Sequence, residues 1–344
     1  MLENDYQFSL LLFRKDGSPL GSASVNVDWE PAVEATRFLH ARHGLVPFCG
    51  EGTAYLQPLW DKLEGEPHIR GFRVIFEARG SRPVSSEFPS RYFREAAAQA
   101  SDEFVKRGKL EAGETYLYQA VAHRNNGAVP ANGAGFLLEA VEQAPAVSLS
   151  QSCLKDVQSR SAPVGVIDAD DMPVFIPRRI LDEVVTLTMQ TEHQETGGIL
   201  IGHLRRDMAL PEIFAEATAQ IAAEHTRSSA TKLTFTAESW NAATAAIRLR
   251  KRSEIFLGYW HSHPVKDWCA SRECSLEKQK QCRLAKDFFS EDDCAVMRAA
   301  FPRAYSLGLV ANNTATEGVT FSLFGWREGG IHARGFHVLE ETHA

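Results

Sequence analysis

Two histidines separated by one residue end an apolar segment in the second half of the chain. They are His261 and His263, in the run Gly-Tyr-Trp-His-Ser-His-Pro at 258–264. Successive side chains on a β-strand point to opposite faces, so both imidazoles project to one side while Ser262 points away. Two imidazoles at a strand end suit a tetrahedral zinc ion. The spacing indicates a metal site, but such a pair also occurs in proteins with no metal.

A carboxylate that could act beside this pair lies upstream, after an expected helix. Glu195 precedes Gly197 and Gly198 in the run Glu-Thr-Gly-Gly-Ile-Leu-Ile-Gly. Glycine has no side chain to crowd its neighbours, so a carboxylate entering this strand can approach an activated water molecule closely. The two runs together therefore place a carboxylate where it could reach a water molecule bound to the metal.

The two runs, the strand and helix expected between them, and Pro264 resemble the JAB/MPN (JAMM) family of zinc metallopeptidases. The resemblance covers about residues 160–330 and does not reach the first part of the chain. It implies an α/β domain over 163–344, an α-β-α sandwich with a mixed sheet of the cytidine-deaminase-like kind. It also implies zinc-dependent cleavage of an isopeptide or peptide bond at the C-terminus of a ubiquitin-like protein.

The end of the family signature, H-x-H-x7-S-x2-D, departs from the pattern here. Counting from the histidines reaches Ser271 and Cys274, whereas Ser290 and Asp293 fit only with about nineteen inserted residues. A thiolate from Cys274 would leave zinc a poorer Lewis acid than a carboxylate does. Asp293 also opens an expected helix that leads to the strand 306–311, the order that the family shows. We therefore assign Ser290 and Asp293, with the first register as the alternative.

The resemblance also implies a mechanism without a covalent intermediate. His261, His263 and Asp293 would hold Zn²⁺ and leave a fourth position for water. Glu195 would take the proton of the water and pass it to the departing amine, while Ser290 and the metal stabilise the oxyanion.

Periodic apolar patterns predict the elements that position these residues. For the second half they predict strands at 164–167, 173–176, 197–202, 213–221, 255–261, 306–311 and 319–326, and helices over 177–192, 238–250 and 293–300. For the first part they predict strands at 6–13, 22–28, 71–78 and 115–122, a helix over 30–43 and helical spacing over 93–104. We expect an α+β module over 1–145, a linker over 146–162 and the peptidase after it. The module would recognise the substrate or a partner.

Composition limits the partners. The chain has 37 Lys and Arg against 44 Asp and Glu, a net charge of -7, which offers no general attraction to nucleic acid. The apolar stretch 8–13 is too short for a signal core or a membrane span, so we expect a cytoplasmic protein without membrane contact. The expected partners are a ubiquitin-like protein or its conjugate, and E1/E2-like enzymes of the same pathway.

Two questions stay open at this stage. Four cysteines, Cys269, Cys274, Cys282 and Cys294, fall within 26 residues, and either a second zinc or ordinary thiols would explain them. The main rival to a peptidase is a non-catalytic MPN-fold scaffold or binding protein in a ubiquitin-like conjugation system. Another is a hydrolase that releases a small peptide or a sulfur-carrier protein.

Overall fold

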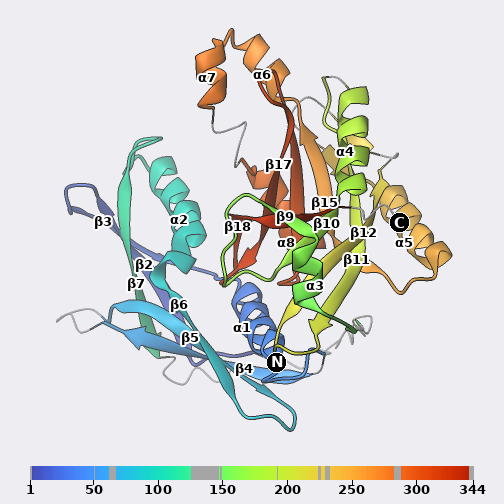
Figure 1. Cartoon of the computed structure of the whole chain (residues 1–344). Coiled ribbons are helices and arrows are strands. Elements are labelled where there is room, and N and C mark those ends of the chain that lie inside the picture. Colours follow the sequence, from blue (N-terminus) through green and yellow to red (C-terminus); the bar gives the residue numbers. More distant parts are fainter. Residues whose placement is uncertain are drawn as a thin grey trace. The chain divides into compact units, whose positions relative to one another are not determined.

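The chain folds into two units, each with its own hydrophobic core (Figure 1). The computed structural model describes residues 2–49, 51–61, 67–124, 147, 149–191, 193–223, 226–228, 233–282 and 288–340. The first unit comprises residues 1–146 with 328–330, and the second comprises 147–327 with 331–344. None of the described helices is long and apolar enough to cross a membrane.

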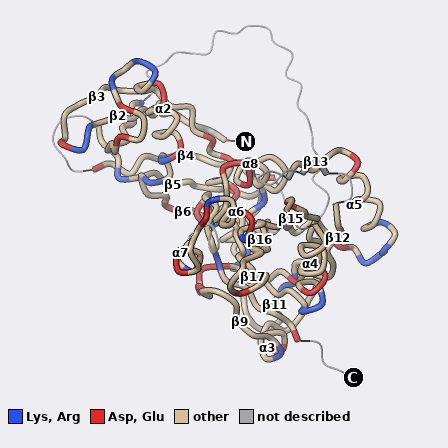
Figure 2. Tube along the Cα trace, turned by 90° about the horizontal axis from the view of Figure 1, so that it is seen from above, with Lys and Arg blue, Asp and Glu red and all other residues tan. Residues whose placement is uncertain are grey.

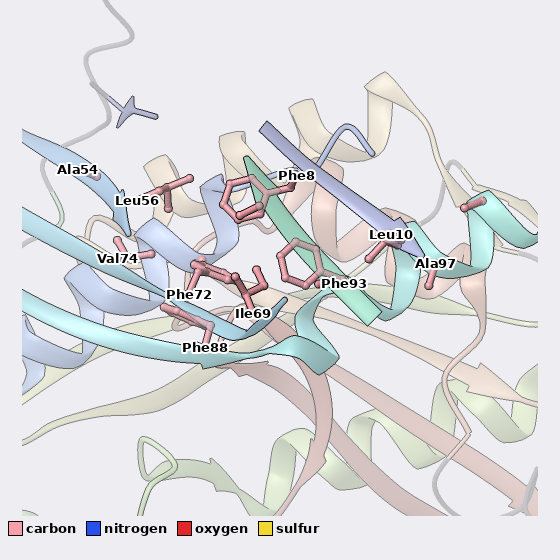
Figure 3. Packing of buried hydrophobic residues seen from close by; sticks show 14 of the residues in the cluster. Phe8, Leu10, Ala54, Leu56, Ile69, Phe72, Val74, Phe88, Phe93 and Ala97 are labelled. Atoms are coloured by element: carbon pink, nitrogen blue, oxygen red, sulfur yellow. The ribbon is translucent and has the colours of Figure 1, made fainter. Parts of the chain in front are cut away.

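The first unit combines two small sheets with two helices. One sheet has the order β1-β4-β5-β6 and the other the order β3-β2-β7. The elements are β1 (Leu2–Glu3), β2 (Tyr6–Arg14), β3 (Pro19–Ser24), α1 (Glu30–Arg42), β4 (Gly52–Trp60), β5 (Ile69–Ala78), β6 (Val84–Pro89), a 3-10 turn (Ser90–Phe93), α2 (Arg94–Lys106) and β7 (Tyr116–Arg124). Aromatic rings fill the core between them, and Phe72 stacks on Phe88 at 5.1 Å, with Phe8 and Phe93 nearby (Figure 3).

The second unit is built on one large mixed sheet. Its strand order is β18-β17-β16-β15-β11-β12-β10-β19-β9, and β8 pairs with β11. The strands are β8 (Ser150–Ser152), β9 (Ser161–Val164), β10 (Val174–Pro177), β11 (Gly197–Asp207), β12 (Ile213–Ala222), β15 (Ile255–His263), β16 (Leu307–Thr314), β17 (Gly318–Arg327), β18 (Gly330–Arg334) and β19 (Phe336–Leu339), with a separate pair β13 (Thr226–Ser228) and β14 (Leu233–Phe235). The helices are α3 (Leu154–Ser159), α4 (Arg178–Gln190), α5 (Ala237–Arg250), α6 (Val265–Ser271), α7 (Leu276–Lys280) and α8 (Glu291–Ala300). The mixed α/β character expected for this part of the chain is therefore present.

The linker predicted over 146–162 is wrong for most of its length. β8 pairs in parallel with β11, and β9 pairs in antiparallel with β19. The short helix α3 between them buries only Leu154 and Val157. Edge strands and a surface helix need few apolar residues, so their polar composition resembled that of a linker.

The two strands nearest the candidate site lie in the middle of this sheet. The first six residues of β11 are all buried, as expected for a strand covered on both faces. On one face, Ile199 and Ile201 pack with Ala243 of α5 and Met297 of α8. Glu195 and the histidine pair thus extend from strands that packing holds firmly.

A substitution at Gly258 tests how closely the central strands must approach each other. It pairs with Leu307 across the parallel strands β15 and β16, and a methyl group added there would overlap the Leu307 carbonyl oxygen. We expect Gly258→Ala to lower the free energy of unfolding by about 1–3 kcal/mol or more, measured by denaturant titration. The control Ala162→Ser, on the exposed side of the edge strand β9, should stay within about 0.5 kcal/mol. Equal denaturant midpoints of unfolding for the two variants would contradict this close packing of β15 on β16.

Candidate metal centre

The end of β15 and the start of α8 bring three metal-ligating side chains together. The Nε2 atoms of His261 and His263 lie 3.0 Å apart. Oδ1 of Asp293 lies 3.2 Å from Nε2 of His261, and the ligand atoms of all three residues lie within 4.8 Å of one another. Both imidazoles are buried, with exposed fractions of 1% and 2%.

This arrangement fits a zinc ion. Ligands about 2.0–2.2 Å from a tetrahedral zinc lie about 3.3 Å from each other, close to the separations seen here. Two imidazole nitrogens that face each other in a buried site need a proton or a cation between them. Two imidazoles and a carboxylate are a donor set that zinc accepts, and they leave a coordination position free.

The first turn of α8 holds Asp293 in place through a capping box. The Ser290 hydroxyl accepts a hydrogen bond from the Asp293 backbone N–H at 3.1 Å. Oδ2 of Asp293 in turn accepts hydrogen bonds from the Ser290 backbone N–H at 2.8 Å and from its hydroxyl at 2.7 Å. The Tyr259 hydroxyl donates to the Asp293 backbone carbonyl at 3.2 Å. These contacts occupy Oδ2 and leave Oδ1 directed at His261.

Ser290 therefore orients a candidate ligand in this structure. Its only hydroxyl proton is donated to Asp293, so it would have to rotate away before it could stabilise an oxyanion. The oxyanion role expected for Ser290 stays a prediction.

Two hydrogen bonds between neighbouring strand ends hold the backbone next to Glu195 beside the histidines. The Thr196 N–H donates to the Ser262 hydroxyl at 2.9 Å, and the Ser262 N–H donates to the Thr196 carbonyl at 2.7 Å. One residue further on, Gly197 pairs with His261. Ser262 is thus a site residue to which the sequence assigned no role, although its place between the two histidines was a signal.

The environment of Glu195 suits proton transfer. The side chain is 5% exposed. Burial is the main cause that raises the pKa of Glu195 to about 7; the nearby His261 lowers it, and Asp293 raises it further. A carboxyl group with a pKa in this range can both accept and return a proton near neutral pH.

Charge and burial set the protonation of the other two groups. Burial, and then the neighbouring His261, lower the pKa of His263 to about 3, so its imidazole is neutral and ready to bind a cation. Burial works to raise the pKa of Asp293, but His261 and the hydrogen bonds from Ser290 outweigh it and hold this pKa below its usual range. Asp293 is therefore ionised at neutral pH.

Aromatic rings wall the two histidines. Tyr259 stacks on His261 with ring centroids 5.5 Å apart and an interplanar angle of 13°. Trp268 and Phe288 lie against His263 at 5.0 and 5.6 Å. Such a wall keeps bulk water from the imidazoles and strengthens the electrostatic interactions inside the site.

Gly198 serves packing in this structure. A methyl group added there would overlap the Ile221 carbonyl oxygen of β12 and lie 2.6 Å from Nε1 of Trp260. Gly198 is therefore a glycine because three strands approach closely at this position. The sequence had suggested another reason, namely that glycine leaves room beside a water molecule.

Ser271 and Cys274, the residues of the alternative register, do not join the histidine pair in the candidate metal group. Ser271 is exposed and donates to the Trp268 carbonyl at 3.0 Å. The backbone N–H of Cys274 donates to the Cys269 carbonyl just beyond α6. Within the part of the chain that the structure describes, the candidate metal group consists of the two histidines and Asp293.

The geometry thus defines a mixed α/β unit in which the half-buried Asp293 lies beside two buried histidines, and one comparison with known proteins agrees with it. Residues 177–267 match the family model described as prokaryotic homologs of the JAB domain. The matched segment contains Glu195, His261 and His263 and ends before Asp293. The match supports the JAB/MPN family for this segment, and that family includes metallopeptidases as well as non-catalytic members.

Other comparisons add little. A solved structure, the solution structure of protein DSY2949 from Desulfitobacterium hafniense, aligns with 49% of this chain and 95% of its own, at 19% identity and a TM-score of 0.34. A likeness this weak says nothing about the fold. None of the curated proteins matches the chain.

Replacing Asp293 tests the proposed ligand set. We expect Asp293→Ala to bind one equivalent of zinc fewer than the wild type, because two imidazoles alone hold zinc weakly; the affinity should fall by roughly 100-fold or more. Asp292→Ala removes the same charge from an exposed neighbour and should bind as much zinc as the wild type. Isothermal titration and metal analysis after desalting measure both. Unchanged zinc binding by Asp293→Ala would exclude this residue as a ligand.

Proposed function

We propose that the second unit is a zinc metallopeptidase that cleaves an isopeptide or peptide bond at the C-terminus of a ubiquitin-like protein. The observation that carries the proposal is the position of Glu195, a buried carboxyl group with a raised pKa, in the same site as the His–His–Asp group. The ubiquitin-like substrate rests on the resemblance of the motifs to the JAMM family.

Each residue of the site has a task in this reaction. His261, His263 and Asp293 would hold the ion, and zinc bound there supplies a Lewis acid that polarises water and the scissile carbonyl group. Glu195 takes the proton from the attacking water and returns it to the leaving amine. Ser262 keeps the Glu195 backbone beside the histidines, so the base does not have to be ordered during the reaction.

The first unit is assigned substrate or partner recognition in this proposal. The ligands and the base all come from the second unit, so the first is free to carry specificity for the ubiquitin-like protein, its target or the E1/E2-like enzymes of its pathway. This assignment rests on the division of the chain alone.

Glu195→Gln separates chemistry from metal binding. It removes the proton acceptor but keeps the size of the side chain, so we expect kcat to fall by about 100-fold to 10,000-fold with zinc binding retained. The substrate is a ubiquitin-like protein joined through a Gly-Gly tail to a reporter, and short peptides and a sulfur-carrier protein complete the panel. Glu317→Gln, at an exposed turn, should keep full activity.

The same assay tests the scaffold alternative. A wild-type protein that binds the ubiquitin-like partner and zinc but cleaves nothing in the panel would sink the peptidase proposal. Cleavage of short peptides alone would instead overturn the substrate class.

Ser262→Ala tests the anchoring of the base. Loss of the hydroxyl leaves the Thr196 N–H without its acceptor, so Glu195 gains freedom while the histidines keep their positions. We expect kcat to fall roughly 10-fold to 100-fold, with KM and zinc content little changed. Ser271→Ala, at the serine of the alternative register, is the control and should behave as the wild type does. A larger effect at Ser271 than at Ser262 would refute the anchoring role.

A further inference from the structure

Three cysteines gather in the segment between β15 and α8 and have no part in the proposed reaction. They are Cys269 in α6, Cys274 after α6 and Cys282 after α7. All three are free thiols; Cys269 is buried and the other two are half-buried. Figures 1 and 2 both show α6 and α7 side by side.

The end of α6 places the first two thiols together. Glu273 has a left-handed backbone with φ of 50°. Its N–H donates to the Ala270 carbonyl at 3.0 Å, and the Cys274 N–H donates to the Cys269 carbonyl at 3.0 Å. This is the Schellman motif, which frequently brings the side chains at the two ends of its longer hydrogen bond into contact. In this chain those side chains are Cys269 and Cys274.

The third thiol joins them from the end of α7. Burial is the main cause that raises the pKa of the Cys269 thiol, and the neighbouring thiols of Cys282 and Cys274 raise it further. The Gln279 side chain donates to the Cys274 carbonyl at 2.9 Å, and the Cys282 N–H donates to the Gln279 carbonyl at 3.1 Å. Cys269 is therefore the centre of a group of three sulfurs.

The segment has almost no apolar core of its own. Helix α7 buries no residue, and α6 buries only Val265 and Cys269. Over 270–282, every side chain is exposed apart from Cys274, Gln279 and Cys282. The residues that point inward are thus mainly thiols, where a small folded segment would otherwise place hydrophobic side chains. Segments with so little apolar burial are commonly ordered by a metal or a covalent crosslink.

We propose that Cys269, Cys274 and Cys282 form a second metal site, which binds a thiophilic divalent cation such as zinc through three thiolates and leaves a fourth position to solvent. Sulfurs bound to zinc at about 2.3 Å lie about 3.8 Å apart. Among the described residues, only the His–His–Asp ligand atoms all lie within 4.8 Å of one another, so the cation must draw Cys274 and Cys282 closer together. The surface exposure of the segment leaves room for that movement.

A disulfide explains the group less well. Oxidation proceeds from an accessible thiolate, whereas the central Cys269 is 4% exposed. A disulfide would also leave one of the three sulfurs unused, while a cation can bind all three.

The site would support one wall of the candidate active site. Trp268, the neighbour of Cys269 in α6, lies against His263. Asp267, in the same helix, lies 3.0 Å from His193. His193 stands two residues before Glu195 in the sequence. A cation that fixes α6 would thereby fix the aromatic ring that shields one of the histidines.

Cobalt binding to the full chain tests the proposal, because only thiolate ligands give a near-ultraviolet charge-transfer band with Co²⁺. We expect the wild type to bind two equivalents and to show this band. Cys269→Ser and, separately, Cys282→Ser should each lose the band and one equivalent, with circular dichroism used to check folding. Cys153→Ser and Cys294→Ser, which change thiols outside the group, should keep both.

Asp293→Ala makes the result independent of the proposed function. It should lose the equivalent held by the histidines and keep the thiolate band, even if the protein proves to be no peptidase. Absence of the band in the wild type, or its persistence in both Cys269→Ser and Cys282→Ser, would overturn the thiolate site. The thiolate site would also be overturned if mild oxidation removed two free thiols and bound cobalt did not protect them.

Discussion

The pairing of β11 with β15 is the interaction on which the candidate site depends. Gly197, the first residue of β11, lies opposite His261, and Thr196 and Ser262 continue the pairing by two hydrogen bonds just before this strand begins. Side chains alternate along a strand, so a slip of one residue would turn Glu195 and the histidines to opposite faces. Because β11 is buried on both faces, such a slip would cost much burial energy. The fixed strand pairing therefore also fixes the positions of Glu195 and the histidines.

Much of the second unit could be predicted because its signals are local. The helix predicted over 177–192 is present as α4 and the strand predicted over 255–261 as β15, each within a few residues. Weak local signals explain the omissions in the first unit. Strand β4 contains Pro58, and the exposed residues of β6 include Ser85 and Glu87, so neither shows a clean apolar alternation. Pairing with β5 holds both strands, and this contact is not visible in either segment alone.

The start of α8 shows why the two registers of the motif are not equivalent. Ser290 and Asp293 form a capping box, and a serine followed three residues later by an acidic residue is a common helix-start pattern. Their spacing therefore has a structural reason besides any chemistry. Ser271 instead ends α6, and Cys274 follows in the turn, so neither can begin a helix directed at the histidines. The local helix-start signal distinguishes the registers without any count of residues from His263.

Local capping also explains how a long insertion can separate the ligands. Asp293 is held by Ser290, by the Tyr259 hydroxyl and, one turn further along α8, by the packing of Met297 in the core. None of these contacts involves α6 or α7, so the length of chain before Ser290 has little influence on where the carboxylate lies. The entropy cost of a longer loop grows only slowly with its length. The segment with the three thiols can therefore fold around its own interactions while both ends remain fixed, at the end of β15 and at the first turn of α8.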